Sequence, residues 1–93
     1  MAKQTVELAL LLDFYGGLLT TKQRAYIELY YNEDYSLAEI ASLNGITPQG
    51  ARDVIARGEA MLRDVELKTG LIDRFGTKLY QDLDPLEGDH YGV

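Results

Sequence analysis

Hydrophobic residues recur at spacings of three and four along most of the first 70 positions, which is the period of amphipathic helices. This pattern predicts four helical segments, at about residues 6–18, 20–32, 37–43 and 48–69. No stretch alternates between hydrophobic and polar residues as a half-buried strand does. The sequence therefore predicts an all-α fold. In the first segment, the stripe predicted to face the core is Leu8, Leu11, Leu12, Tyr15 and Leu18.

Three of the predicted helices begin with residues that can cap the free amide groups of a first turn. Two of these starts have the spacing of a capping box, and the third places proline at the first helical position, where its missing N–H costs nothing. These residues are Thr20 with Gln23, Ser36 with Glu39, and Thr47 before Pro48. The caps give the predicted helices firm boundaries.

Residues 36–57 carry the most specific pattern in the chain. A short helix, a turn at residues 44–46 and a longer helix from Pro48 predict a helix-turn-helix unit with a small domain around it. Ala41 is small where the two helices would cross, Gly45 suits a left-handed turn, and Ile46 would fill the corner. The residues expected to share one core across this unit are Ile40, Ala51 and Val54.

The fourth segment has its own hydrophobic stripe and a glycine inside it. Gly58 permits either a bend or a close contact with another helix, at a cost of roughly 1 kcal/mol against alanine. Gly70 is the expected end of the segment. Its predicted buried residues are Ala51, Val54, Ile55, Met61, Leu62 and Val65.

The domain organisation follows from where these signals weaken. Residues 1–70 are expected to form the helix-turn-helix domain, and residues 71–93 a C-terminal extension. The extension has hydrophobic residues for a short helix, interrupted at Gly76, and then becomes a polar acidic tail from Asp82 that we expect to be mobile. The residues that would form this helix are Leu71, Ile72, Phe75, Leu79 and Tyr80.

Charge and composition narrow the classes of function. The 93-residue chain has a net charge of −6, and residues 71–93 account for half of it, with five acidic residues against two basic ones. An acidic chain binds nucleic acid only through a locally basic face. There is no cysteine, and the apolar run near the N-terminus lacks a basic leader and is too short to span a bilayer. We therefore expect a cytoplasmic protein without membrane insertion.

The start of the fourth segment holds the candidate nucleic-acid-binding residues, because the second helix of such a unit enters the major groove. They are Thr47, Gln49, Gly50, Arg52, Asp53 and Arg57. Gln49 could pair with adenine and Arg52 with guanine. The charges of residues 47–69 cancel, however, with four basic residues against four acidic ones. The alternative is that these positions are simply a solvated helix face.

The inventory of reactive side chains predicts a protein that is not an enzyme. The only histidine is His90, and no glycine-rich phosphate loop follows a strand, so no catalytic residue, metal site or cofactor is predicted. Three of the seven tyrosines lie together, at Tyr26, Tyr30 and Tyr31. Aromatic residues at this spacing form either core or dimer contacts, or a platform on which unpaired bases stack.

Residues 8–66 resemble the YlxM family of small bacterial helix-turn-helix proteins. The resemblance rests on Asp13-Phe14-Tyr15, Leu18-Leu19-Thr20, Lys22-Gln23-Arg24, Tyr30-Tyr31, Asp34, Ser36-Leu37, Glu39-Ile40-Ala41, and Gln49 with Asp53, Ile55 and Arg57. The same stretch is similar to the fourth region of primary-type sigma factors, which recognises promoter DNA. Three positions depart from the pattern expected for nucleic-acid contact, at Pro48, Gly50 and Val54.

The resemblance implies a function in protein targeting. The YlxM family is linked to the signal recognition particle through gene neighbourhood, so the implied role is that of a regulatory or accessory protein which contacts the particle's proteins or its RNA. Two alternatives stay open from the residues. One is a DNA-binding transcriptional regulator. The other is a homodimeric interaction module that pairs through the first helix and the C-terminal part of the fourth.

Overall fold

The computed structural model describes residues 5–76, and this part of the chain contains helices and no strand. The all-α prediction is therefore confirmed. The elements are α1 (Val6–Tyr15), the 3-10 helix η1 (Gly16–Leu18), α2 (Thr21–Tyr31), α3 (Leu37–Asn44), α4 (Pro48–Thr69) and the π-helical turn η2 (Ile72–Gly76). In the described range, no helix is both long enough and apolar enough to cross a membrane.

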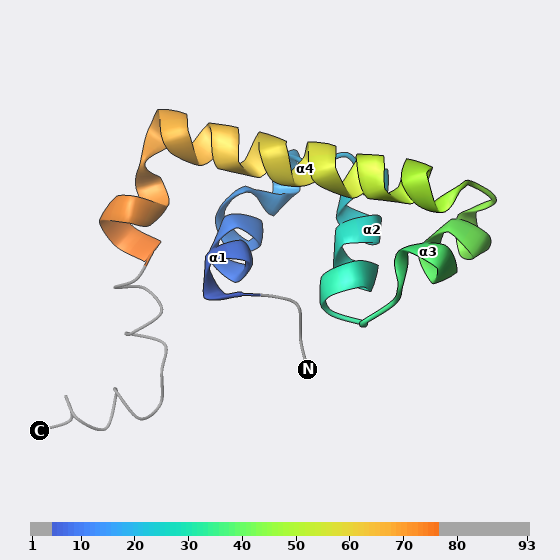
Figure 1. Ribbon diagram of the computed structural model, residues 1–93. Coiled ribbons are helices and arrows are strands. Elements are labelled where there is room, and N and C mark those ends of the chain that lie inside the picture. The colour runs from blue at the N-terminus through green and yellow to red at the C-terminus, as the bar shows by residue number, and fades with distance from the viewer. Residues whose placement is uncertain (1–4, 77–93) are drawn as a thin grey trace, which may run out of the picture.

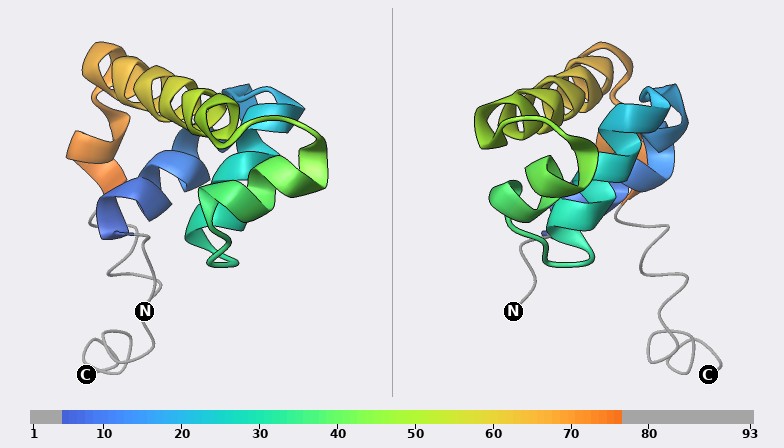
Figure 2. Two further views of the ribbon diagram at one scale, coloured as in Figure 1. Left: turned by 45° about the vertical axis from the view of Figure 1, so that its right-hand side comes forward. Right: turned by 90° about the vertical axis from the view of Figure 1, so that its right-hand side faces the viewer.

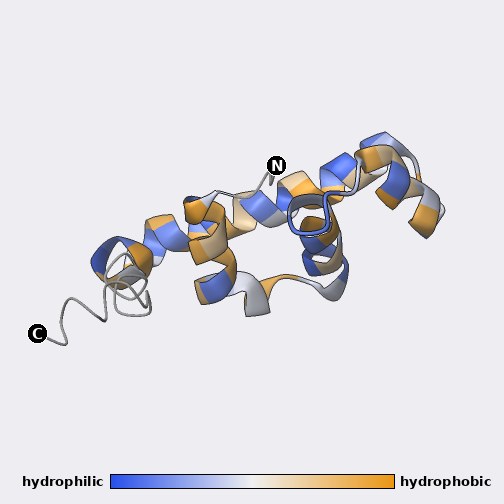
Figure 3. Ribbon diagram, turned by 90° about the horizontal axis from the view of Figure 1, so that it is seen from below, coloured by the Kyte–Doolittle hydropathy of each residue, from blue (hydrophilic) through white to orange (hydrophobic). Residues whose placement is uncertain are grey.

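Helix α4 is the axis on which the other elements are arranged. Its 22 residues give it a length of about 33 Å, and α1, α2 and α3 all lie on one side of it (Figure 1). The left view of Figure 2 shows η2 folding back from the end of α4 to lie beside α1, which it contacts. Figure 3 shows hydrophobic and hydrophilic residues interspersed along the helices, as expected for amphipathic helices with a period of three to four residues. The buried core joins all four α-helices through Leu8, Leu11, Leu12, Tyr15, Leu19, Tyr26, Ile27, Ile40, Ala41, Ala51, Ile55 and Leu62.

The three predicted helix caps are confirmed by their hydrogen bonds. The Thr20 hydroxyl accepts the Gln23 amide at 3.0 Å, and the Gln23 side chain accepts the Thr20 amide at 3.0 Å. Ser36 and Glu39 form the same reciprocal box at the start of α3. The Thr47 hydroxyl accepts the Gly50 amide at 3.0 Å, with Pro48 at the first position of α4.

The helix-turn-helix unit is formed by α3, the turn after it and α4. Gly45 ends α3 in the left-handed conformation, with φ of 67°. The Ile46 amide then donates to the Ala41 carbonyl at 3.0 Å, which closes the corner. Ala41 of α3 and Ala51 of α4 are both buried, and the two helices contact each other. The predicted motif and its turn are confirmed.

The prediction for Leu18 was wrong. The α-helix ends at Tyr15, and residues 16–18 form a tighter 3-10 turn, which changes the direction of the side chains that follow. Leu18 is 63% exposed, and Leu19 enters the core in its place. The pair Gly16-Gly17 explains the change, because glycine lacks the side-chain contacts and the propensity that would continue the helix.

Gly58 marks the closest approach between α2 and α4. A Cβ atom on Gly58 would lie 2.8 Å from Cδ1 of Ile27, and 3.4 Å from both Cβ of Gln23 and Cδ2 of Leu19. Ile27 is fully buried, so its side chain has little room to move away. Helix α4 continues without a break through Gly58. Of the two explanations for this glycine, the close helix contact is therefore the correct one.

A network around Glu66 joins α1, the end of α4 and η2. The Tyr15 hydroxyl donates to the Glu66 carboxylate at 2.6 Å and shares a hydrogen bond with the Thr69 hydroxyl at 2.5 Å. The same carboxylate accepts the backbone amides of Ile72 and Asp73 at 3.1 and 3.0 Å. The hydrogen bond from Tyr15 lowers the pKa of Glu66, and burial together with the carboxylate raises the pKa of Tyr15.

This network places the start of the C-terminal extension against the core. Ile72 is partly buried there, so residues 72–76 contact α1 rather than standing apart from it. The division of the chain at residue 70 stays a prediction. The predicted helical positions Leu79 and Tyr80, and the acidic tail from Asp82, lie outside the described residues.

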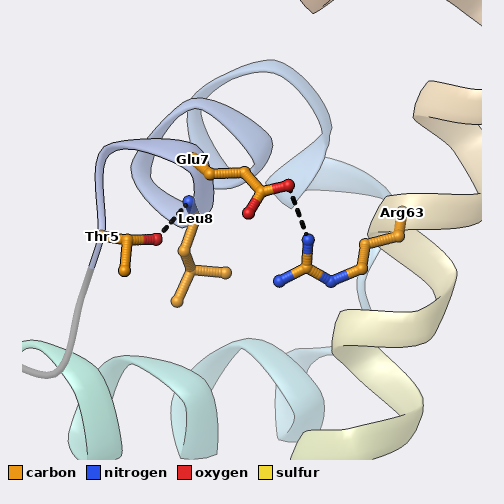
Figure 4. A network of polar contacts seen from close by, with 4 residues as sticks. All are labelled: Thr5, Glu7, Leu8 and Arg63. Atoms are coloured by element: carbon orange, nitrogen blue, oxygen red, sulfur yellow. Dashed lines mark hydrogen bonds and ion pairs between the residues drawn. The ribbon is translucent and has the colours of Figure 1, made fainter.

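A surface ion pair provides a second link between α1 and α4. Figure 4 shows Glu7 reaching from the first turn of α1 to Arg63 of α4, at 2.9 Å. Beside it, the Thr5 hydroxyl accepts the Leu8 amide and caps α1. Both charged groups are substantially exposed, so this pair is expected to contribute less than about 1 kcal/mol.

The first prediction concerns Gly58→Ala. Helix propensity alone would stabilise α4 by about 1 kcal/mol, but we expect a net loss of roughly 1 kcal/mol because the added methyl group meets the buried Ile27. Urea unfolding measures the difference. Ala60→Gly, on the exposed side of the same helix, provides the matched control for propensity and should lose about 1 kcal/mol. A Gly58→Ala protein more stable than the wild type would contradict the close contact.

The second prediction concerns Glu66→Gln and pH. Because the folded-state pKa of Glu66 is lowered, its stabilising effect is present above the ordinary glutamate pKa and is lost as pH falls through the folded value. Melting temperatures measured from pH 7 down to pH 3 should therefore fall more steeply in the wild type than in Glu66→Gln. Asp64→Asn, in an exposed ion pair with Lys68, is the control and should keep the wild-type slope. Equal slopes for the wild type and Glu66→Gln would show that the network does not contribute.

Candidate functional site

All six residues predicted to touch nucleic acid lie at the start of α4; Gly50 is half-buried, and the other five are exposed. Thr47 caps the helix, and the Gln49 side-chain amide donates to the Asp53 carboxylate at 3.0 Å. Arg52 and Arg57 differ from these three, because within residues 5–76 neither arginine makes an ion pair or a side-chain hydrogen bond. The structure thus places the five residues on one part of the surface, and the role of each stays a proposal.

Four other cations of the described chain, outside the helix-turn-helix unit or further along α4, are engaged. Arg24 pairs with Glu28, Arg63 with Glu7 and Lys68 with Asp64, each at 2.9 Å. The Lys22 ammonium lies over the Tyr26 ring, 5.8 Å from its centroid. Arg52 and Arg57 are therefore the cations on the helix-turn-helix unit that are left available for an external partner.

The two arginines do not form a continuous basic stripe. Five residues of helix separate them by about 140° around the axis and about 7.5 Å along it. On the same geometry Asp53 lies between them, and its carboxylate is held by Gln49. The exposed face at the start of α4, formed by Thr47, Gln49, Arg52, Asp53 and Arg57 and called here the α4 face, thus carries charges of both signs.

A groove of about 370 Å³ adjoins the α4 face. It lies between the end of α2, the start of α3 and α4, and Arg52 forms part of its wall. Its lining residues are Tyr30, Tyr31, Leu37, Arg52, Ile55, Ala56 and Glu59. The groove therefore combines aromatic and aliphatic surface with one cation and one carboxylate.

The tyrosine cluster divides between the core and this groove. Tyr26 is buried in the core. Tyr30 and Tyr31 line the groove and meet edge to face, with ring centroids 4.9 Å apart. The Tyr31 hydroxyl donates to the Glu59 carboxylate, and burial together with this carboxylate raises the pKa of Tyr31. The sequence reasoning identified the cluster but missed the groove and the bond to Glu59.

The polar groups of the α4 face and the groove are few in kind. They are two guanidinium groups, two carboxylates held by Gln49 and Tyr31, one side-chain amide and the hydroxyls of threonine and tyrosine. In the range that the structure covers, no three His, Asp or Glu side chains are grouped so that they could hold a metal ion. His90 lies outside that range.

Comparison with known proteins assigns the chain to a family. Residues 2–88 match the family described as "Putative helix-turn-helix protein, YlxM / p13 like". The chain belongs to this family. The resemblance noted from the sequence is therefore confirmed, and with it the helix-turn-helix class.

Relatives in the YlxM / p13-like family match about three quarters or more of the chain. A UPF0122 protein of Acetivibrio thermocellus is 55% identical over 69 residues, which is 74% of this chain and 59% of that protein. A UPF0122 protein of Geobacillus sp. is 47% identical over 75 residues, covering 81% of this chain and 68% of the relative. A UPF0122 protein of Symbiobacterium thermophilum is 46% identical over 70 residues, covering 75% of this chain and 65% of the relative. The chain thus spans about three fifths to two thirds of these relatives.

The third prediction separates the α4 face from the folded core. Arg52→Ala and Arg57→Ala should each change the free energy of unfolding by less than about 0.5 kcal/mol, because neither side chain has a partner in the fold. Tyr31→Phe should lower it by about 1 kcal/mol, because Glu59 then loses its hydrogen-bond donor. Urea unfolding monitored by circular dichroism measures all three. A large loss in either arginine variant would show that these side chains serve the fold instead of a partner.

Proposed function

We propose that the protein is a non-enzymatic accessory protein of the signal recognition particle pathway, and that it acts in the cytoplasm by binding a component of that pathway through the α4 face. Membership of the YlxM / p13-like family supports the helix-turn-helix part of this proposal. The resemblance described from the sequence supports the link to protein targeting.

The observation that carries the proposal is the state of Arg52 and Arg57. Long cationic side chains on a protein surface often pair with a nearby carboxylate, as Arg24 does with Glu28. Arg52 and Arg57 are exposed and unpaired in the described fold, and Arg52 also forms part of the wall of a groove with two tyrosines. Arginine and tyrosine are the residues that contribute most to protein interfaces, because they combine large contact area with directional hydrogen bonds.

The distribution of charge favours a protein component of the pathway. DNA binding through the major groove gains most from a continuous positive surface, whereas Asp53 lies between the two arginines and four acidic residues balance four basic ones over residues 47–69. A GTPase surface with its own carboxylates and cations would complement such a mixed face.

A second candidate is binding of duplex DNA as a transcriptional regulator. One observation favours it: the two unpaired arginines lie at the start of the second helix of a helix-turn-helix unit, where contacts to bases and phosphates are made. Pro48 and Gly50 lack long polar side chains that could extend to the bases. DNA binding is therefore less favoured than binding to a protein.

The fourth prediction tests both candidates with one set of variants. The chain has no cysteine, so Ala2→Cys allows a single fluorescent label at a residue that is not part of the α4 face. Fluorescence anisotropy then measures binding of the labelled chain to the purified particle GTPase, the receptor GTPase, the particle RNA and a pool of random duplex DNA. We expect saturable binding to one GTPase, weakened at least about tenfold in the double variant Arg52→Ala/Arg57→Ala.

The control for this experiment is the double variant Arg24→Ala/Lys68→Ala. It makes the same change in net charge but removes two cations that are already paired on the surface, so its affinity should stay within about twofold of the wild type. Binding to the DNA pool alone, with a steep loss of affinity as salt rises, would favour the second candidate. Absence of binding to any pathway component would contradict the proposal.

A further inference from the structure

The outer side of α2 and α3 carries two shallow grooves that meet at Tyr35. The groove on the α2 side has a volume of about 480 Å³, and the groove on the α3 side about 270 Å³. Together their lining residues are Ala25, Glu28, Leu29, Glu33, Tyr35, Glu39, Ser42 and Leu43, and this surface is called here the α2–α3 face. It shares no residue with the α4 face, and the loop that joins α2 to α3 lies on the side of the domain away from α4 (Figures 1 and 2).

The backbone of the loop fixes the shape of this face. The Glu33 amide donates to the Glu28 carbonyl at 3.1 Å, and the Tyr35 amide donates to the Leu29 carbonyl at 3.0 Å. Asp34 makes the turn between them with φ of 60°, a conformation that aspartate tolerates better than most residues. Tyr35 is therefore held beside the last turn of α2, so the two grooves are built into the fold and do not depend on a partner to form.

The face presents apolar surface at its centre. Leu43 is 65% exposed on α3, although its neighbours Ile40 and Ala41 are buried on the other side of that helix. Leu29 and Tyr35 are half-buried and border the core. An apolar side chain of a partner that entered either groove would contact Leu29, Tyr35 or Leu43 and be removed from water.

The rim of the face is acidic. Its lining residues include three glutamates, Glu28, Glu33 and Glu39, and neither lysine nor arginine. One of these carboxylates is compensated by Arg24, which pairs with Glu28, so the local charge is −2. Glu39 is held in position because its carboxylate accepts the Ser36 amide at 2.7 Å in the capping box.

We infer that the α2–α3 face is a docking site for a basic segment of a partner protein, which places a leucine, isoleucine or phenylalanine into the grooves and lysine or arginine residues against the glutamates. Charge complementarity selects this occupant. A second copy of the chain would bring the same carboxylates against each other in a symmetric pair, and nucleic acid would bring phosphates against them. The inference does not rest on the proposed function, because a different face and different residues carry it.

The fifth prediction uses two synthetic peptides as probes. Both are amphipathic and contain leucine and alanine, one with lysine and the other with glutamate at every polar position. Titration of the ¹⁵N-labelled chain should give saturable binding of the lysine peptide, with amide shifts concentrated in residues 25–43. Leu43→Ala and Glu33→Lys should each weaken binding at least about fivefold, since they remove the exposed apolar contact and reverse one rim charge.

Matched control variants distinguish binding at the α2–α3 face from nonspecific binding elsewhere on the surface. Leu67→Ala removes a leucine that is 85% exposed on α4, and Asp64→Lys reverses an exposed charge near it. Both should leave the affinity within about twofold. Circular dichroism shows whether each variant is folded. All four substituted residues are exposed, so we expect all four variants to fold. Equal binding of the glutamate peptide, shifts concentrated outside residues 25–43, unchanged binding in both face variants, or no saturable binding of the lysine peptide would overturn the inference.

Discussion

The contact between Ile27 of α2 and Gly58 of α4 sets the distance between the two helices that the rest of the domain depends on. No side chain other than hydrogen fits between them at this distance. Leu19 packs against the same point from the segment before α2. Leu62, one turn further along α4, is also fully buried. The core therefore packs against one side of α4, from Ala51 to Leu62.

This arrangement leaves the opposite side of α4 to solvent, and the two halves of the helix have different surroundings. Its C-terminal half is tied to α1 through Tyr15, Glu66 and the ion pair of Glu7 with Arg63. Its N-terminal half projects with α3 as the helix-turn-helix unit and carries the unpaired Arg52 and Arg57. The proposed binding surface thus lies on a rigid element that is anchored at its far end, a geometry that keeps a recognition surface ordered before its partner arrives. The acidic, apolar α2–α3 face would allow a second partner to bind at the same time.

The parts of the fold that the sequence predicted are those that local interactions determine. A capping box connects residues three positions apart, and a left-handed turn at Gly45 needs only the absence of a side chain, so both can be identified without knowledge of packing. The exposure of Leu18 could not be predicted from periodicity, because the glycine pair before it breaks the helix period. The hydrogen bond of Tyr31 to Glu59 joins residues 28 positions apart, and only the packing of α2 on α4 brings them together.

The candidate site was predicted as a set of residues but not as a charge pattern. The sequence cannot tell which cations find partners, since Arg63 and Glu7 are separated by 56 positions. The predicted homodimer through α1 and the end of α4 also stays a prediction. Exposed apolar side chains do lie on these elements and on η2, at Val6, Leu67 and Phe75, but exposure alone does not identify what covers them.

We propose that this protein contacts the targeting machinery through the start of α4. Amide hydrogen exchange of the chain, measured free and in the presence of the purified signal recognition particle GTPase, tests it most directly, because it reports which part of the backbone is protected by a partner. We expect added protection at residues 47–57 and in the groove beside them, with α1 and the Glu66 network unchanged. Protection confined to α1, the end of α4 or η2 would contradict it.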